Sequence, residues 1–442
     1  MGIRTIAGVI LGVLHAAVAL AQSSEEMPPL SLAPPPKSPV GPVMPGVVVS
    51  QALQSPAEIP PAPLPIPVAT PGLNSGQRVI AVDSARAPVR WWGNAEYLIW
   101  WPKQQPLIPL LTGNNDGFIP VVGSPGTAVL IGNSSVKTLN VPGGRFSLGA
   151  NLGGQYNFGI EANYFFLGTQ NSFYSSGGFP QEAYSFLGIP FVDPSSNQED
   201  SYSLRTFRDG GSLNAFTSTR VTGWEALFSM SLYEMPGFRI QGLLGYRYFL
   251  ANEGLQIQVS QNDTVFDQDF QLFNQSTLRY DEVNTSNRFH GGTLGTRTNI
   301  ALGAAGFFEL DSKISIGNVK QVVQRSGGNI VTTEGNANPV VTDNSGIFVQ
   351  PSNAGKYVNT LYAFVPETGM KLGFNYGPAK VYFGYNVIYL SQAARPSDQL
   401  DRTLELNQLA NGFPGTFNRP SNATVSNDFW VQGVSFGLEL SY

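Results

Sequence analysis

Apolar and polar side chains alternate along residues 430–442, at the C-terminal end of the chain. Because a strand points successive side chains to opposite faces, one face of this segment is apolar and the other is small and polar. In a soluble sheet the apolar face would cover a core. In an outer-membrane barrel it would meet lipid, and the polar face would line the lumen. We expect this strand and its terminal aromatic residue to be the insertion signal of such a barrel, carried by Trp430, Phe436, Leu438, Leu440 and Tyr442.

The same two-residue period recurs in earlier parts of the chain. Each such segment has large apolar residues on one parity and small or polar residues on the other. The period is imperfect at 288–298 and 307–317 and clear in the remaining segments. Together with the terminal segment they make ten predicted strands, an even number. The earlier segments lie at 91–101, 145–152, 156–166, 224–232, 238–250, 288–298, 307–317, 364–376 and 381–389.

The connections between these segments alternate in length. Short ones lie near 153–154, 234–237, 299–305 and 377–379, and long polar ones span 102–143, 168–219, 251–286, 320–357 and 392–428. Outer-membrane barrels have short periplasmic turns and long outer loops, whereas a soluble sandwich has no reason to sort its loops in this way. We therefore predict an all-β fold, a transmembrane antiparallel up-and-down β-barrel of about ten strands over residues 90–442, with both termini in the periplasm.

The composition agrees with a barrel and excludes several classes of function. Only 12% of the residues are charged, about half the usual share of a soluble protein. No stretch after the N-terminal segment has the roughly 20 apolar residues that a membrane helix needs. The absence of Cys excludes disulfides, thiolate metal sites and Cys nucleophiles. A net charge of −5 without a basic cluster argues against nucleic acid as a partner. We predict no metal and no cofactor.

The N-terminal residues read as a targeting segment followed by a linker. Arg4 is a positive n-region, 6–20 is an apolar stretch, and Ala19-Leu20-Ala21 is a small-x-small cleavage site before Gln22. We predict a cleaved signal peptide at 1–21, with an uncleaved anchor helix as the alternative. Residues 28–71 hold 15 of the 33 prolines. Because such chain tends to extended polyproline II and builds no core, we predict a Pro-rich disordered periplasmic arm at 22–89, which is a spacer or a tether to peptidoglycan.

The charged residues of the predicted strands avoid the apolar face. Arg or Lys facing lipid costs roughly 2–4 kcal/mol at the bilayer midplane, so we expect these side chains to face the lumen. A ten-stranded barrel is only slightly wider than the eight-stranded kind, whose interior side chains nearly fill. We expect Glu161 and Glu367 to pair in part with Arg145 and Lys371, leaving a polar plug or a thin thread of water. The alternative is scattered polar groups with no shared role. The predicted lumen residues are Glu96, Arg145, Glu161, Glu225, Arg239, Arg247, Glu367, Lys371, Lys380 and Glu439.

Several short segments also resemble a known family, the type-seven putative beta-barrel porins that are abundant in planctomycete bacteria. The resemblance spans about 90–442 and implies an outer-membrane location, but it leaves the solute open. The segments that carry it are Trp92-Gly93-Asn94-Ala95-Glu96-Tyr97-Leu98, Pro351-Ser352-Asn353-Ala354-Gly355, Phe364-Val365-Pro366-Glu367, Phe383-Gly384-Tyr385-Asn386, Arg395-Pro396-Ser397-Asp398-Gln399-Leu400-Asp401 and Gly433-Val434-Ser435-Phe436-Gly437-Leu438.

Three functions follow from this sequence. The first is a narrow porin or channel for small solutes. The second is a structural or surface-interaction barrel of the envelope, adhesin-like, with a plugged lumen. The third is a barrel hydrolase, which would need His290 beside a Ser, Asp or Glu at the outer rim. Since His290 is the only His after the signal peptide, we interpret it as a polar lumen residue and predict no enzyme. The expected partners are outer-membrane lipid, the barrel-assembly machinery and, through the arm, peptidoglycan.

Overall fold

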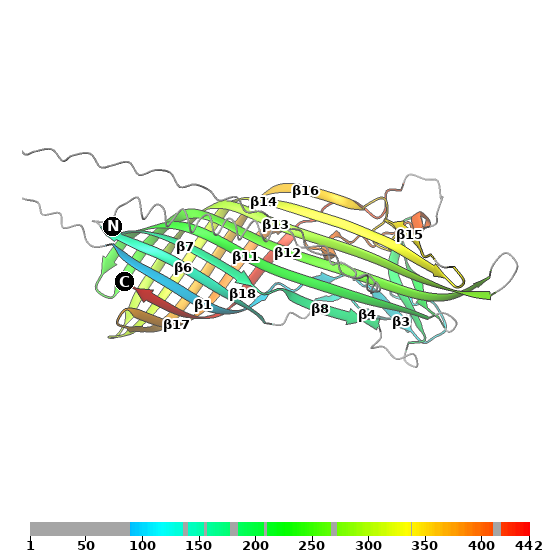
Figure 1. The fold of residues 1–442 in the computed structure, drawn as a ribbon, viewed down its shortest axis with the longest axis horizontal. Helices are drawn as coiled ribbons and strands as arrows, with labels where there is room; N and C mark the ends of the chain where they lie inside the picture. The colour runs from blue at the N-terminus through cyan, green and yellow to red at the C-terminus, as the bar shows by residue number, and fades with distance from the viewer. Residues whose placement is uncertain are drawn as a thin grey trace, which may run out of the picture. The chain divides into compact units, whose positions relative to one another are not determined.

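Ten antiparallel strands close into a ring in the computed structural model of this protein. The structure describes residues 89–135, 140–153, 157–176, 184–206, 210–266, 272–336, 338–409 and 417–442. The predicted signal peptide at 1–21 and all but residue 89 of the predicted arm lie outside this part of the chain. Each strand of the ring pairs with the next along the chain, and the last pairs with the first (Figure 1). The ring strands are β1 (Arg90–Pro102), β6 (Val141–Gly153), β7 (Phe158–Leu167), β11 (Gly210–Met235), β12 (Phe238–Phe266), β13 (Leu272–Leu302), β14 (Gly306–Thr333), β16 (Gly355–Tyr376), β17 (Ala379–Ala393) and β18 (Asn427–Ser441).

The prediction of a ten-stranded antiparallel barrel is confirmed by this ring. All ten predicted segments overlap a ring strand, and the start of β1 lies beside the end of β18 at one end of the barrel, where Trp92 is the register partner of Ser441. The short turns lie at the same end. Glycines in these turns adopt a left-handed backbone without a steric penalty, for example Gly237 at φ +79° and Gly377 at φ +62°. The predicted turn at 153–154 is described only as far as Gly153, the last residue of β6.

Three of the predicted long loops are wrong in part, because ring strands continue into them. β11 begins at Gly210, so the last part of 168–219 is strand. Residues 251–266 and 272–286 belong to the paired strands β12 and β13, whose register runs from Phe238↔Ile300 to Phe266↔Leu272. β14 likewise continues to Thr333 and β16 starts at Gly355, so only part of 320–357 is loop. β12 has 29 residues, roughly 95 Å at about 3.3 Å per residue, whereas a barrel strand crosses a membrane in roughly 9–11 residues. The hairpin therefore extends far beyond one bilayer (Figure 1).

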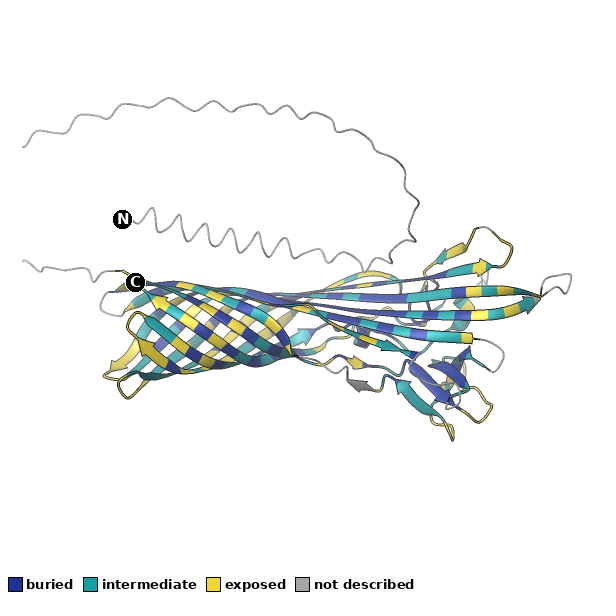
Figure 2. Cartoon of the chain, turned by 60° about the horizontal axis from the view of Figure 1, so that its bottom comes forward, coloured by how far each residue is buried: buried dark blue, intermediate teal, exposed yellow. Residues whose placement is uncertain are grey.

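The alternation reverses where the strands leave the apolar belt of the barrel. On β12, Leu244 and Tyr246 are exposed on the outer face, whereas Leu255, Ile257 and Val259, on the opposite parity, are buried. A barrel wall in lipid needs apolar side chains outside, and a sheet that covers a core in water needs them inside. The reversal preserves the two-residue period and moves the apolar side chains to the inner face. Figure 2 shows the change from alternating exposure in the barrel to buried stretches further along the strands.

The segments beyond the belt build a second packed body. It contains the four-stranded sheet β10–β9–β3–β4, the pair β2–β5, two 3-10 helices and strands β8 and β15, which pair with β11 and β14. A buried cluster that includes Leu111, Ile189, Ile257, Phe348 and Leu404 joins these segments to the extended strands. The bounds are β2 (Pro106–Leu107), β3 (Leu111–Asn114), β4 (Ala128–Ile131), β5 (Ser134–Ser135), β8 (Gln170–Ser175), β9 (Phe186–Asp193), β10 (Gln198–Arg205), β15 (Val340–Asp343), η2 (Ser397–Gln399) and η3 (Leu406–Leu409). Within the described ranges, no helix is long and apolar enough to cross a membrane.

Candidate functional site: the barrel interior

The outer face of the ring carries a belt of exposed apolar side chains. On β18 the exposed apolar side chains are those of Phe436, Leu438 and Leu440, followed by the terminal Tyr442. Trp430 lies on the same face as Phe436 and is partly exposed. Tyr442 also exchanges backbone hydrogen bonds with Trp91, which ties the chain end to β1. The predicted insertion signal therefore lies together on one face, and its role in assembly stays a prediction.

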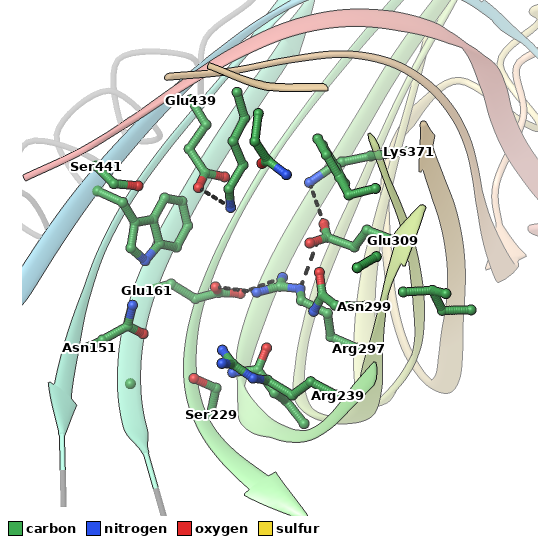
Figure 3. A pocket seen from close by; sticks show the side chains of 18 of the residues that line it. Asn151, Glu161, Ser229, Arg239, Arg297, Asn299, Glu309, Lys371, Glu439 and Ser441 are labelled. Carbon is green, nitrogen blue, oxygen red and sulfur yellow. Dashed lines mark hydrogen bonds and ion pairs between the residues drawn. The ribbon is translucent and has the colours of Figure 1, made fainter. Parts of the chain in front are cut away.

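Inside the ring, the end that carries the short turns contains a cavity of about 650 Å³, which we call the vestibule (Figure 3). All ten ring strands contribute to its wall. Its charged side chains pair with one another: Arg297 Nη1 lies 2.8 Å from Glu161 Oε2, Lys371 Nζ 2.9 Å from Glu309 Oε1, and Lys380 Nζ 2.7 Å from Glu439 Oε1. At the rim, Arg239 pairs with Glu234 at 2.7 Å.

Deeper in the barrel, six charged residues form a layer across the lumen, and all of them except the partly exposed Arg145 are buried. Arg247 on β12 contacts Glu225 on the neighbouring β11 and Glu367 on β16. Because β13 and β14 separate β12 from β16 in the ring, the second contact crosses the interior. Lys313 contacts the same two carboxylates at 2.5 and 3.4 Å. Arg145 lies 3.5 Å from Glu96 and 3.9 Å from Glu367. The space left between these side chains is only about 40 Å³, little more than the volume of one water molecule.

The structure places all ten predicted lumen residues along these two cavities. The expected partners are partly wrong, however. Glu161 pairs with Arg297 rather than with Arg145, and Lys371 pairs with Glu309. Glu367 has Arg145 within 3.9 Å but makes its closest contact with Arg247.

The sequence reasoning missed four interior charged residues, which lie on the two strands that were judged imperfect. On β14, Glu309, Asp311 and Lys313 alternate with outward residues such as Ile314, and Arg297 is the corresponding residue on β13. Arg297 Nε lies 2.8 Å from Asp311 Oδ1 as well as close to Glu161. The signal was present at 308–316, where acidic and basic residues occupy one parity. The missed residues add two cations and two anions, so the interior stays balanced.

A layer of buried apolar side chains lies on the far side of the charged layer from the vestibule, and we call it the apolar layer. Each of the ten ring strands supplies at least one member, so the layer fills a complete cross-section of the barrel. This corrects the prediction of a uniformly polar lumen: on β1, Leu98 and Trp100 follow Glu96 on the same parity and are both 0% exposed. The members are Leu98, Trp100, Val141, Leu167, Val221, Phe249, Ala251, Phe289, Val319, Ala363, Val365, Ile388, Leu390, Ala393, Phe429 and Val431.

A buried ion pair covers the outer side of the apolar layer. Arg395, just after β17, donates from Nε and Nη2 to the two carboxylate oxygens of Glu253 on β12, at 3.0 and 2.6 Å, and both side chains are 0% exposed. Nη1 donates to the carbonyl of Gln104 and Nη2 also donates to that of Lys103, both just after β1. The guanidinium also lies 5.5 Å from the ring centroid of Phe429, a member of the apolar layer. Arg395 thus joins β12, β17, β18 and the segment after β1 at one point.

A second buried acid organises the body beyond the belt. Asp281 lies on the part of β13 that extends past the apolar belt, and its carboxylate accepts hydrogen bonds from the backbone N–H groups of Ile347, Phe348 and Val349 at 2.7–3.1 Å. Burial raises the pKa of Asp281 to about 6, and the three backbone donors only partly offset this effect. Asp281 therefore titrates in a range that a cell envelope can experience.

His290 does not face the lumen, so its interpretation as a lumen residue is wrong. It is exposed on the outer face of β13, because its neighbour Phe289 takes the inward parity. Its Nδ1 lies 2.8 Å from the hydroxyl of Tyr246, and its ring centroid lies 4.9 Å from that of Tyr248. His290 thus belongs to an aromatic group on the outer wall.

A family model described as "Putative beta barrel porin-7" matches residues 92–442. The chain belongs to this family. Membership makes it an outer-membrane barrel protein, as the ring and the exposed belt also indicate, and the match covers the ring from the third residue of β1 onward. No curated protein matches the chain.

Among solved structures, the chain is similar to the outer membrane protease OmpT from Escherichia coli, with 10% identity, 80% of this chain and 97% of that chain covered, and a TM-score of 0.35. It is also similar to a Pseudomonas aeruginosa FadL homologue, with 8% identity, 80% and 90% covered, and a TM-score of 0.21. At these scores the similarity says nothing about what the chain does.

Proposed function

We propose that this protein is an outer-membrane barrel with a plugged lumen, which holds the body beyond the belt at the cell surface for structural or adhesive contacts. The observation that carries the proposal is the apolar layer, to which all ten ring strands contribute. A cross-section filled by Trp100, Phe249, Phe289 and Phe429 offers a hydrated solute no side-chain acceptor and only the Trp100 indole N–H as a donor, so passage would require the layer to rearrange.

The proposal places both termini and the short turns in the periplasm and the extended strands outside. Outer-membrane barrels have short turns on the periplasmic side, which supports this orientation. Outer-membrane lipid would surround the belt, and the barrel-assembly machinery would insert the chain through its C-terminal strand. The proposal includes no enzymatic activity, in line with a family that is described as porins.

A narrow porin for small solutes is the second candidate, and the family description favours it. Conductance of the refolded protein in a planar bilayer separates the two. A plugged barrel gives membranes with inserted protein but no regular current steps. A step conductance that scales with the amount of inserted protein would overturn the proposal in favour of the porin.

The same experiment can be sharpened with a paired variant. Trp100→Gly with Phe429→Gly removes two large rings from the apolar layer, and Tyr97→Gly with Phe146→Gly removes two rings from the outer face of the neighbouring strands β1 and β6. The inward pair should open a conductance that the outward pair does not. Equal behaviour of the two pairs would show that the layer does not control passage.

A further inference from the structure

The vestibule has the size of a ligand site. Its volume of about 650 Å³ falls within the roughly 300–1,000 Å³ that is usual for small-molecule pockets. The charged layer closes its inner end, and turn residues such as Pro236 and Gly237 form its rim. It is a blind pocket built on the strands of a rigid barrel (Figure 3).

The charges of the vestibule favour a neutral occupant. Four cations and four anions line it, and each cation makes an ion pair of 2.7–2.9 Å with one of these anions. A charged ligand would have to break one of these pairs or leave its own charge uncompensated, which is costly in a confined space. A neutral ligand can instead use the remaining lone pairs and N–H groups of the paired side chains. The eight residues are Arg239, Arg297, Lys371, Lys380, Glu161, Glu234, Glu309 and Glu439.

The uncharged part of the wall supplies planar amides, hydroxyls and an aromatic face. The buried side chain of Asn94 donates to Tyr382 at 2.6 Å and to Glu96 at 3.2 Å, while its Oδ1 has no hydrogen-bond partner among the described residues. The Trp92 indole lies against Gly149 on the neighbouring strand, where a Cβ would overlap the ring. Gly149 therefore gives the indole room at the wall. The other amides and hydroxyls are those of Ser147, Asn151, Asn163, Ser229, Gln241, Asn299, Asn375 and Ser441.

We infer that the vestibule binds a neutral polyhydroxylated ligand, a sugar or the end of a glycan chain, which enters from the end with the short turns. Hydroxyl groups pair with planar amides and with ion-paired carboxylates and cations, and the apolar face of a pyranose ring stacks on an aromatic ring such as Trp92. The inference goes beyond the proposed function. It rests on that function only in placing the vestibule in the periplasm, where cell-wall glycan would be the available ligand.

Calorimetric titration of the refolded barrel in a detergent without a sugar headgroup tests the inference. The probes are the N-acetylglucosamine disaccharide, maltose and sodium phosphate. We expect saturable binding of at least one sugar. If the N-acetylglucosamine disaccharide binds more tightly than maltose, the ligand is a cell-wall amino sugar, and if maltose binds more tightly, it is a glucose-containing sugar. Absence of saturable binding of both sugars, or tighter binding of phosphate than of either sugar, would overturn the inference.

Two variants with a matched control locate the binding. Trp92→Leu and Gly149→Ala should each weaken sugar binding at least tenfold, because the first removes the aromatic face and the second displaces it. Trp91→Leu is the control, since Trp91 is the adjacent residue and takes the opposite face of β1. Equal weakening by the control would place the sugar outside the vestibule. Heat-modifiable migration on gels checks that each variant is folded. The conductance experiment is independent of this one, so a conducting barrel that binds sugar would overturn the plugged-barrel proposal and leave this inference intact.

Discussion

Replacing Glu253 with Gln should destabilise the barrel strongly, because it leaves the buried Arg395 cation without its counter-charge. The pair is bidentate, at 2.6 and 3.0 Å, and both side chains are completely buried. Removing one partner of a buried ion pair typically costs 3–5 kcal/mol, since the remaining charge keeps its desolvation penalty. Gln keeps the shape of Glu, so no cavity adds to this cost. We therefore expect Glu253→Gln to lower the free energy of unfolding by about 3–5 kcal/mol.

A matched control is available in the same outer body. Glu199 pairs with Arg402 at 2.5 Å, but the two side chains keep 32% and 21% of their surface exposed. Pairs that solvent reaches contribute roughly 0–1 kcal/mol. Glu199→Gln should therefore change the free energy of unfolding by less than about 1 kcal/mol. The double variant Glu253→Leu with Arg395→Met should recover much of the loss, because an apolar pair of similar volume often replaces a buried ion pair at little cost.

Urea unfolding of the protein in detergent micelles, followed by Trp fluorescence, measures these differences as shifts of the midpoint at constant slope. If Glu253→Gln shifts the midpoint no more than Glu199→Gln does, water reaches the Glu253–Arg395 pair. The expectation that this pair is shielded from solvent would then be refuted. A double variant that is less stable than Glu253→Gln alone would instead show that the hydrogen bonds from Arg395 to the Lys103 and Gln104 carbonyls dominate.

Three further predictions concern the ends of the chain and the outer body. Mass spectrometry of the mature protein should find its N-terminus at Gln22, after cleavage behind Ala21; retention of the preceding residues in the membrane fraction would reject the signal peptide. Replacing Phe436 and Tyr442 with Ser should block assembly, seen as loss of heat-modifiable migration of the outer-membrane fraction, and normal assembly would show that this end is no insertion signal. Because the pKa of Asp281 is raised by burial from 3.8 to about 6, the folded state binds its proton more tightly, and stability should fall by up to about 3 kcal/mol as the pH rises from about 4 to above 6. Hydrogen exchange of the backbone amides at 347–349, corrected for its intrinsic pH dependence, should therefore be faster at pH 7.5 than at pH 5. Asp281→Asn should abolish this difference. Equal protection of these amides at both pH values would contradict the raised pKa.

The sequence by itself determined the strands of the membrane part and the side chains that face outward. On β18, the alternation of Phe436, Leu438 and Leu440 with Ser435 and Gly437 is a local property of the chain, so it could be read without knowing any neighbour. The sequence also determined where the short turns lie and that Glu96 and Glu161 point away from the apolar face. Both follow because every strand of the belt must present apolar side chains to lipid.

The extended strands could not be predicted with the same rule. Beyond the belt, Leu255 and Ile257 take the parity that is polar in the membrane, so the pattern reads as broken although the two-residue period continues. The reversal acquires its meaning only when the cluster around Phe348 and Ile189 is present to cover the inner face. Strand continuation there depends on segments that are distant in the sequence.

Only the tertiary structure decided what fills the barrel. Arg247 and Glu367 are 120 residues apart and meet across the lumen, and Arg297 rather than Arg145 reaches Glu161. The apolar layer is a still stronger case, since a strand such as β13 contributes a single member, Phe289. One inward phenylalanine carries no signal in its own segment. Closure of the ring brings such single side chains to one level, and a plug then arises from packing between residues that no local pattern connects.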